Sequence, residues 1–382
     1  MKTRFLLFAM LILNYIAIAQ QTEKIPGYAK DQRPMSWYKQ QIKLNEAILQ
    51  KNPKDESAWF NDFKATRIIL RHDTTDKRDA SVKDEDLKKL VDRMGLEIPN
   101  SYSYNFAKWE LGGNDMSLYP YLEKAIDIDP NRTDHFEYMV NMSELTRDIK
   151  QRDIYSNKLI NANLLSSGMM YYNYNTMIGL SKNAILLTSG DNDSYPTWAL
   201  QAKGIRKDVH VLNMYLLQIK SYREKVFTEL GIPQIDMETK EEKEKFNKKI
   251  IQLISENKKK YPVYVALTTA GCEEYLTDIE NNLYLTGLAY QYDTASFDNM
   301  AVLRNNFEQR YALDYLDKVL YTEISREWVS MINQNYLVPM MKLYSHYKES
   351  GDVQKQQWMK EKILLLAKDS AEQDTILKYV NE

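Results

Sequence analysis

The chain has 382 residues, a formal net charge of −2 at pH 7, 44% hydrophobic residues and a single cysteine. A charge this close to balance, with no persistently basic stretch, disfavours nucleic acid as a partner. The lone Cys272 excludes an internal disulfide and a cysteine-based zinc site, so packing alone must hold the fold.

The first nineteen residues have the layout of a secretory signal. Two basic residues precede an apolar run from Phe5, and Ala17–Ala19 supplies small residues for cleavage before Gln20. An uncleaved membrane anchor is the alternative, but the apolar run is short for a span. No cysteine lies near the cleavage site, and no later segment is long and apolar enough to cross a bilayer. We therefore expect a periplasmic protein with a cleaved signal peptide, which is not a lipoprotein and has no transmembrane segment in the mature chain.

Residues 20–182 follow a helical pattern with signs of a repeat. Counting back from Pro130, apolar residues recur at helix-hairpin spacing and Gly113 falls at the turn: Tyr102, Phe106, Trp109, Leu118, Leu122 and Ala125. This spacing resembles a tetratricopeptide repeat. Similar phrases end at Pro53 and recur near the C-terminus around Gly351. The resemblance implies stacked antiparallel helix pairs over 20–182 and again over 301–382, which present a surface to a partner.

Between these helical regions, residues 183–300 indicate a small α/β segment. Apolar runs predict strands over 184–188, 209–213, 263–267 and 287–292, and a charged amphipathic helix over 239–259. Ser194 and Pro196 predict a helix start between the first two strands, which completes a βαβ unit. The predicted fold class is therefore mixed α/β but mostly α, with tetratricopeptide-like helix hairpins flanking a small Rossmann-like segment.

Two phrases in this segment carry a family resemblance: ILLTSGDNDSYPTWALQAKGIRKDVHVLNMYLL and NNLYLTGLAYQY. They resemble the soluble periplasmic C-terminal region of Bacteroidota multi-spanning membrane proteins of the protein O-glycosyltransferase type. Thr197 and Lys203 depart from the family pattern, which has an apolar and an acidic residue there. The family's transferase activity belongs to a membrane-embedded half that this chain lacks. The resemblance thus implies a related accessory domain, a Bacteroidota source and a periplasmic location.

The turn after the first predicted strand holds the candidate ligand-binding residues, because open α/β sheets bind ligands at the carboxyl ends of their strands. Asp191 and Asp193 are weak candidates to hold Mg²⁺ or Mn²⁺ and, with it, a nucleotide-sugar pyrophosphate. The alternative, which we favour, is that Asp193 or Ser194 caps the helix while its neighbours satisfy turn amides. Aromatic residues in this helix would then pack against the helical layer instead of lining a pocket. The full candidate set is Asp191, Asn192, Asp193, Ser194, Tyr195 and Trp198.

The other reactive side chains lack the spacing that a metal site or a nucleophilic active site requires. The four histidines are not paired at metal-ligand spacing, and His210 lies in an apolar strand. Ser189 is not in a nucleophile elbow, and Cys272 is followed by two glutamates that would keep its thiol inert. No phosphate-loop or dinucleotide fingerprint occurs, and we expect neither a catalytic residue nor a cofactor.

The sequence therefore favours a periplasmic binding or scaffold protein over an enzyme. It would engage an envelope protein or peptide through its helical repeats, as an accessory to protein glycosylation or envelope assembly. The alternative is an enzyme or binder of carbohydrates or nucleotide sugars that acts through the acidic turn Asp191–Asp193.

Overall fold

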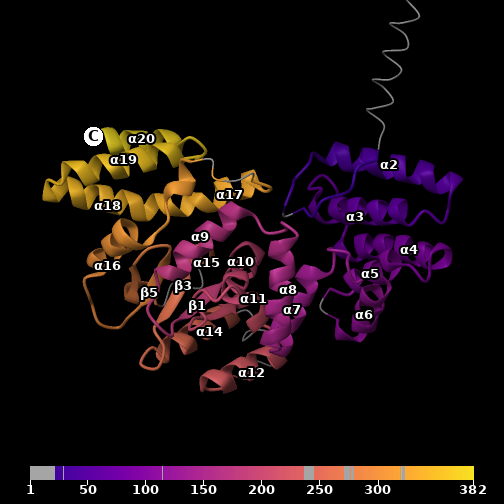
Figure 1. The fold of residues 1–382 in the computed structure, drawn as a ribbon, viewed down its shortest axis with the longest axis horizontal. Coiled ribbons are helices and arrows are strands. Elements are labelled where there is room, and N and C mark those ends of the chain that lie inside the picture. The colour runs from indigo at the N-terminus through magenta and orange to yellow at the C-terminus, as the bar shows by residue number, and fades with distance from the viewer. Residues whose placement is uncertain are drawn as a thin grey trace, which may run out of the picture. The chain divides into compact units, whose positions relative to one another are not determined.

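The computed structural model describes residues 22–28, 30–113, 115–235, 245–270, 276, 279–318, 320 and 323–382. The expected signal segment, the first part of the predicted helix over 239–259, and Cys272 lie outside these residues. The chain forms two compact units, Met1–His135 and Phe136–Glu382. Most of the described chain is helical, and its sheet is small and mixed (Figure 1).

The first unit is built of helices in consecutive contact, drawn in indigo and purple in Figure 1. Its elements are α2 (Met35–Lys51), α3 (Glu56–His72), α4 (Ala80–Glu97), α5 (Tyr102–Leu111), the 3₁₀ turn η1 (Met116–Leu118) and α6 (Tyr119–Ile128). The pairs α2–α3 and α5–α6 pack as hairpins, and α4 packs against α3 and α5. Their shared core includes Trp59, Phe63, Val91 and Met94, all nearly inaccessible to solvent.

Local sequence explains where these helices start and stop. Asp55 and Ser101 accept backbone N–H groups at the starts of α3 and α5, which satisfies donors that a helix leaves unpaired. Gly113 has a φ of +59°, the left-handed conformation that glycine adopts without strain. The helix hairpin predicted before Pro130 is confirmed as α5–α6. At Pro53 the described chain has one helix before the proline, α2, and its hairpin partner α3 follows it.

The second unit begins with helices that pack with the sheet segment. Its first half contains α7 (Phe136–Thr146), α8 (Ile149–Asn161), α9 (Ser167–Ile178), β1 (Ile185–Thr188), α10 (Asp191–Ala202), β2 (His210–Asn213), α11 (Met214–Leu217), α12 (Lys220–Leu230), α14 (Phe246–Glu256), β3 (Val263–Ala266) and α15 (Leu267–Ala270). Helices α8 and α9 both contact α10, so 136–182 belong to the same compact unit as the sheet. The division expected from the sequence, into 20–182, 183–300 and 301–382, follows changes in the type of element along the chain. It stays a prediction.

The second half of this unit closes the sheet and returns to helices. It contains η3 (Glu280–Asn282), β4 (Leu283–Leu285), β5 (Ala289–Tyr292), α16 (Asn299–Asn305), the π-helical turn η4 (Asn306–Arg310), η5 (Asp314–Leu316), α17 (Arg326–Asn333), η6 (Gln334–Tyr336), α18 (Leu337–Ser350), α19 (Val353–Ala367) and α20 (Gln373–Asn381). The hairpin α18–α19 turns at Gly351, whose φ is +73°, as the C-terminal pattern predicted.

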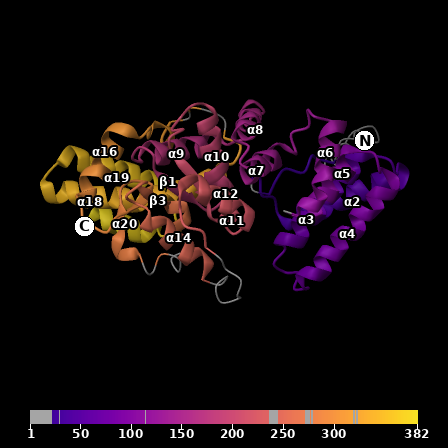
Figure 2. The same cartoon turned by 90° about the horizontal axis from the view of Figure 1, so that it is seen from below.

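The sheet has the strand order β2-β1-β3-β5-β4. Strand β1 is parallel to β2 and β3, with Thr188 opposite Asn213, while β5 is antiparallel to β3 and β4. Figures 1 and 2 both show α9 and α10 on one side of β1 and β3, with α14 on the other. The four predicted strands and the βαβ unit are confirmed. The sequence did not predict β4, because a strand of three residues is too short to show an alternation of apolar and polar side chains.

Candidate functional site

The carboxyl ends of β1 and β3 form the switch point of the parallel part of the sheet. From β1 the chain crosses through α10 to β2 on one side, and it later returns to β3 on the other side. Crevices at such reversals are where open α/β sheets bind ligands. The acidic turn predicted as a candidate site lies at this point.

Asp193 is buried at the switch point and fully engaged by the fold. Its carboxylate accepts the backbone N–H groups of Ser189 and Gly190 at 3.0 and 2.8 Å. It also accepts the hydroxyls of Thr268 at 2.7 Å and Ser194 at 3.2 Å. Burial raises the pKa of Asp193, and these four hydrogen bonds act in the opposite direction. Since the bond from Gly190 is the return half of a capping box, Asp193 secures both the start of α10 and the segment after β3.

Ser194 joins the two parallel strands beside it. Its hydroxyl lies 2.8 Å from the Thr188 hydroxyl at the end of β1 and accepts the Asn213 amide from the end of β2 at 2.9 Å. Only 1% of Ser194 is exposed. This side chain is therefore part of the sheet's edge and not of an open surface.

Helix α10 begins three residues earlier than the sequence predicted. Its first residue is Asp191, so Pro196 lies inside the helix instead of in its first turn. Proline has no N–H for the carbonyl four residues before it, which here is that of Asn192. The side-chain amide of Asn173 on α9 donates to this carbonyl at 2.8 Å. A partner from a neighbouring helix thus replaces the missing backbone donor, which the sequence pattern could not reveal.

The remaining candidates divide between the surface and the interior. Asp191 is exposed and Asn192 half-buried, whereas Tyr195 is half-buried and Trp198 is 1% exposed. The rings of Tyr195 and Trp198 meet edge to face, with their centroids 5.8 Å apart. The guanidinium of Arg152 on α8 lies 6.0 Å from the centre of the Trp198 ring. The structure therefore brings Asp193 and Ser194 together in the interior and places Trp198 against the helical layer, while Asp191 faces outward.

The histidines and Cys272 are a separate class of candidate, for metal binding or nucleophilic chemistry. Within the described ranges, no group of three or more histidine, cysteine or acidic side chains could hold a metal ion. His210 packs edge-on against the Tyr261 ring at 5.0 Å, and burial lowers its pKa. Cys272 and the glutamates beside it lie outside the described residues.

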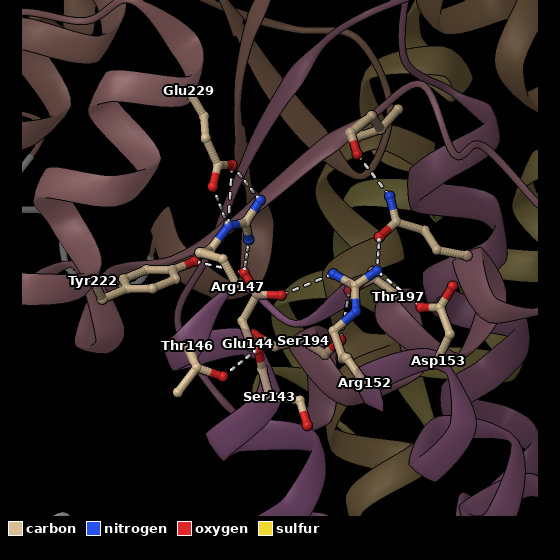
Figure 3. Close-up of polar contacts among 12 residues, drawn as sticks. Ser143, Glu144, Thr146, Arg147, Arg152, Asp153, Ser194, Thr197, Tyr222 and Glu229 are labelled. Atoms are coloured by element: carbon tan, nitrogen blue, oxygen red, sulfur yellow. Dashed lines mark hydrogen bonds and ion pairs between the residues drawn. The ribbon is translucent and has the colours of Figure 1, made fainter. Parts of the chain in front are cut away.

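A buried ion-pair network that the sequence did not predict fastens α10 to the helices around it (Figure 3). Glu144 at the end of α7 is completely buried and accepts Arg152 at 2.8 Å, the Tyr222 hydroxyl at 2.8 Å, and Arg147. Arg147 also pairs with Glu229 of α12 at 2.8 Å. Helices α7 and α8 are consecutive, but α12, which supplies Tyr222 and Glu229, is far from them in sequence. Local spacing alone therefore does not predict the complete network.

Arg152 carries this network into the α/β segment. Its guanidinium donates to the Gln201 side-chain oxygen at 3.3 Å, and the Gln201 amide donates to the Val209 carbonyl just before β2 at 2.6 Å. The end of α10 and the entry into β2 are thereby tied to α8. The charges serve to position α10 against its neighbours.

The GIRKDV part of the family phrase forms a backbone clamp. Arg206, with a φ of +47°, donates to the carbonyls of Met177 and Leu180 at 2.6 and 3.0 Å and to that of Ser181 at 2.6 Å. Asp208 accepts the same guanidinium at 2.9 Å, and this pairing lowers its pKa. The clamp holds the end of α9 and the segment that leads into β1. Arg206 and Asp208 therefore have a structural role.

The second family phrase depends on close packing at one glycine. A Cβ on Gly287 would overlap the hydroxyl of Tyr311, which accepts the Leu288 N–H at 3.2 Å. Beside it, the Asn306 amide donates to the Thr286 carbonyl at 2.6 Å. Asn306 lies in the π-helical turn η4, so the phrase is shaped by a distant segment that returns to the sheet.

Comparisons with known proteins relate part of this chain to a described domain. A family model described as TMEM260-associated domain 2 matches residues 169–229, from α9 to α12. The match contains the acidic turn and the clamp, and covers less than half of the chain. No curated protein matches.

Among solved structures, the crystal structure of yeast Tom70 is similar, with 12% identity and a TM-score of 0.27. The alignment covers 91% of this chain and 58% of the Tom70 chain, so this chain spans little more than half of that protein. A TM-score this low does not define a shared fold. In the part of the chain that the structure describes, no helix has the length and apolarity needed to span a bilayer.

Proposed function

We propose that this protein is a binding scaffold of the bacterial periplasm that engages an envelope protein or peptide through its tetratricopeptide-like helix hairpins. The observation that carries this proposal is that the side chains at the switch point use their hydrogen bonds within the fold. Asp193 and Ser194 occupy the place where an α/β sheet presents groups to a ligand, yet their hydrogen bonds are made within the fold. The α/β segment then serves to hold helices in position. The match to TMEM260-associated domain 2 supports a glycosylation context for this role. We propose an accessory role in protein glycosylation, with envelope assembly as the alternative.

The C-terminal helices supply a surface suited to this role. Ile324 just before α17, Met331 in α17 and Val338 in α18 are seven positions apart in sequence, and their exposed fractions are 43%, 61% and 51%. Apolar side chains exposed together on a helical surface mark sites where another protein binds. We assign the partner contact to this row.

In vivo crosslinking in the native host tests the assignment. A photo-reactive residue placed at Val338 should crosslink one envelope protein reproducibly, and the purified pair should bind with a measurable Kd. Met331→Glu and Val338→Glu should each weaken that binding at least tenfold. The matched control is Ile154→Glu on α8, an apolar residue that is 44% exposed and lies outside the row. Equal binding by all three variants would refute the proposed surface.

The second candidate is a carbohydrate or nucleotide-sugar binder, and one observation favours it. Asp191 is exposed at the carboxyl edge of the sheet, beside the switch point. Isothermal titration with UDP-glucose, with and without MnCl₂, tests this candidate. Heat of binding that Asp191→Ala abolishes, without a change in melting temperature, would favour the second candidate over the scaffold.

A further inference from the structure

Residues 22–28, which we call the strap, lie against hairpin α2–α3 and bury one side chain in it. The strap forms neither helix nor strand. Within it, Ile25 alone is buried, with 0% of its surface exposed. This side chain belongs to one apolar cluster with Tyr38 of α2 and with Ala65 and Ile68 of α3. A single aliphatic residue therefore anchors the strap to both helices.

The backbone of the strap supplies two hydrogen bonds to the same hairpin. The N–H of Glu23 donates to the side-chain oxygen of Gln41 on α2 at 3.0 Å. The N–H of Ile25 donates to the side-chain oxygen of Asn61 on α3 at 3.3 Å. Extended peptides that dock on other proteins are held in this way, by main-chain hydrogen bonds for affinity and a side-chain pocket for specificity. Because these two acceptors contact only backbone groups, they can serve a segment of different sequence.

Two further residues define what the hairpin recognises. Pro26 favours an extended conformation of Ile25, because proline keeps the residue before it out of the helical region. The ring of Tyr28 is stacked on the ring of His72, the last residue of α3, with their centroids 3.9 Å apart. The recognised pattern is thus an aliphatic residue before proline, with an aromatic ring two positions after the proline.

Most of the strap stays outside the core. Glu23, Lys24 and Gly27 are exposed, so the attachment depends on Ile25, the stacked ring and the two backbone donors. Segments with few buried apolar contacts open at a small free-energy cost while the rest of the fold remains intact. A segment of another chain that carries the same pattern can make the same contacts once the strap has opened.

We propose that this face of α2–α3, the strap site, binds an extended segment of another protein that carries an aliphatic residue before proline. The strap is then an internal competitor, which fills the site until such a segment displaces it. The strap site consists of Tyr38, Gln41, Asn61, Ala65 and Ile68. It belongs to the first compact unit and the row of Ile324, Met331 and Val338 to the second, so the two assignments are independent.

Fluorescence polarisation with the full-length protein tests the site. The probe is a labelled peptide of residues 22–31, TEKIPGYAKD. Ile25→Asp in the protein removes the anchor of the strap, so this variant should bind the peptide with a measurable Kd. The wild type should bind about tenfold more weakly, because its own strap competes at a high effective concentration. Val82→Asp, the same change at a 45% exposed residue of α4, is the matched control and should bind as the wild type does.

The contacts predict which further changes weaken this binding. Asn61→Ala in the Ile25→Asp protein removes one backbone acceptor and should weaken peptide binding about fivefold. A peptide with the Ile25→Asp change should not bind. Equal binding by the wild type and the Ile25→Asp protein, or no binding by a folded Ile25→Asp protein, would overturn the proposal.

A second measurement uses the wild-type protein and remains decisive if Ile25→Asp does not fold. The unlabelled peptide is added in large excess with the change Ile25→Val, which preserves an aliphatic side chain and distinguishes the peptide by mass. Hydrogen–deuterium exchange should then show faster exchange in residues 22–28, whereas α2 and α3 keep their protection because the peptide covers the same face. Unchanged exchange in residues 22–28 would show that the strap cannot be displaced and would also overturn the proposal.

Discussion

The side-chain amide of Asn173 donates to the backbone carbonyl of Asn192 at 2.8 Å, and this is the carbonyl that the ring nitrogen of Pro196 cannot serve. Helix α10 therefore keeps a proline in its second turn without an unpaired acceptor in the interior. The acidic residues Asp191 and Asp193 lie in the first turn of this helix, so their geometry depends on α9.

This relationship predicts a coupling between Asn173 and Pro196. Asn173→Ala leaves the Asn192 carbonyl unpaired and should cost about 1–3 kcal/mol of unfolding free energy. Pro196→Ala restores a backbone N–H to that carbonyl, so the same Asn173 change should cost clearly less in a Pro196→Ala background. Urea denaturation of the four proteins measures the coupling. Strictly additive effects would show that the two residues act independently.

The two aspartates of the turn should differ sharply in their effect on stability. Asp193→Asn loses acceptor capacity for buried N–H and O–H groups and should cost about 2 kcal/mol. Asp191→Asn changes an exposed side chain and should stay within about 0.5 kcal/mol of the wild type. Denaturant unfolding curves measure both changes. A large loss of stability in Asp191→Asn would contradict the assignment of Asp193 as the structural member.

Gly287 should tolerate a side chain only when the Tyr311 hydroxyl is removed. Gly287→Ala forces a methyl group into that hydroxyl and should cost about 1–3 kcal/mol. Tyr311→Phe alone loses the bond to Leu288 and should cost about 1 kcal/mol. The double variant should be more stable than the sum of the single effects predicts, as measured by thermal unfolding. If the penalty at Gly287 is the same with phenylalanine at 311, the hydroxyl is not its cause.

The buried network of Figure 3 should be far more sensitive than its exposed end. Glu144→Gln leaves Arg152 and Arg147 without their buried carboxylate and should cost about 3–5 kcal/mol. Glu229→Gln removes a carboxylate whose side chain is 46% exposed, so it should cost less than about 1 kcal/mol. Calorimetric unfolding of both variants provides the comparison. Similar losses from both would contradict a buried anchor at Glu144.

Acid should weaken the contact between η4 and the C-terminal hairpin. Burial alone would raise the pKa of Glu308, but hydrogen bonds from Lys355, Tyr347 and Arg304 outweigh it and hold the pKa at about 2. Because this pKa is depressed in the folded state, the stabilisation is present above the unfolded value of 4.5 and is lost as the pH falls through about 2. Acid unfolding followed by circular dichroism should show a smaller pH dependence over this window in Glu308→Gln than in the wild type. An unchanged profile would mean that protonation of Glu308 is not linked to unfolding.

Much of the architecture was readable from local pattern. The hairpin ending near Pro130 depends on apolar spacing and on Gly113, and both act within one stretch of chain. The βαβ unit depends on short apolar strands on either side of one helix, which is also a local signal. The start of α10 was wrong by three residues, because Pro196 is usually a first-turn residue and its replacement donor lies on another helix.

The sequence located the candidate turn correctly at the carboxyl end of β1, but it could not show which of its side chains are buried and which are exposed. Asp191 and Asp193 differ by two positions and share the same chemistry. One is exposed and the other is enclosed by Ser189, Gly190 and Thr268. Only the tertiary fold brings Thr268, which follows β3, close enough to donate its hydroxyl to Asp193. This contact distinguishes the two aspartates.

By itself, the sequence determined the helix hairpins, the parallel strands and the position of the acidic turn, because hydrophobic periodicity, caps and glycines act over a few neighbouring residues. Only the tertiary structure decided which polar groups are committed to the fold. Glu144 meets Tyr222, and Gly287 meets Tyr311, across long stretches of chain. Such pairings arise when packed elements exclude water, and no local pattern encodes which distant group will then complete a hydrogen bond.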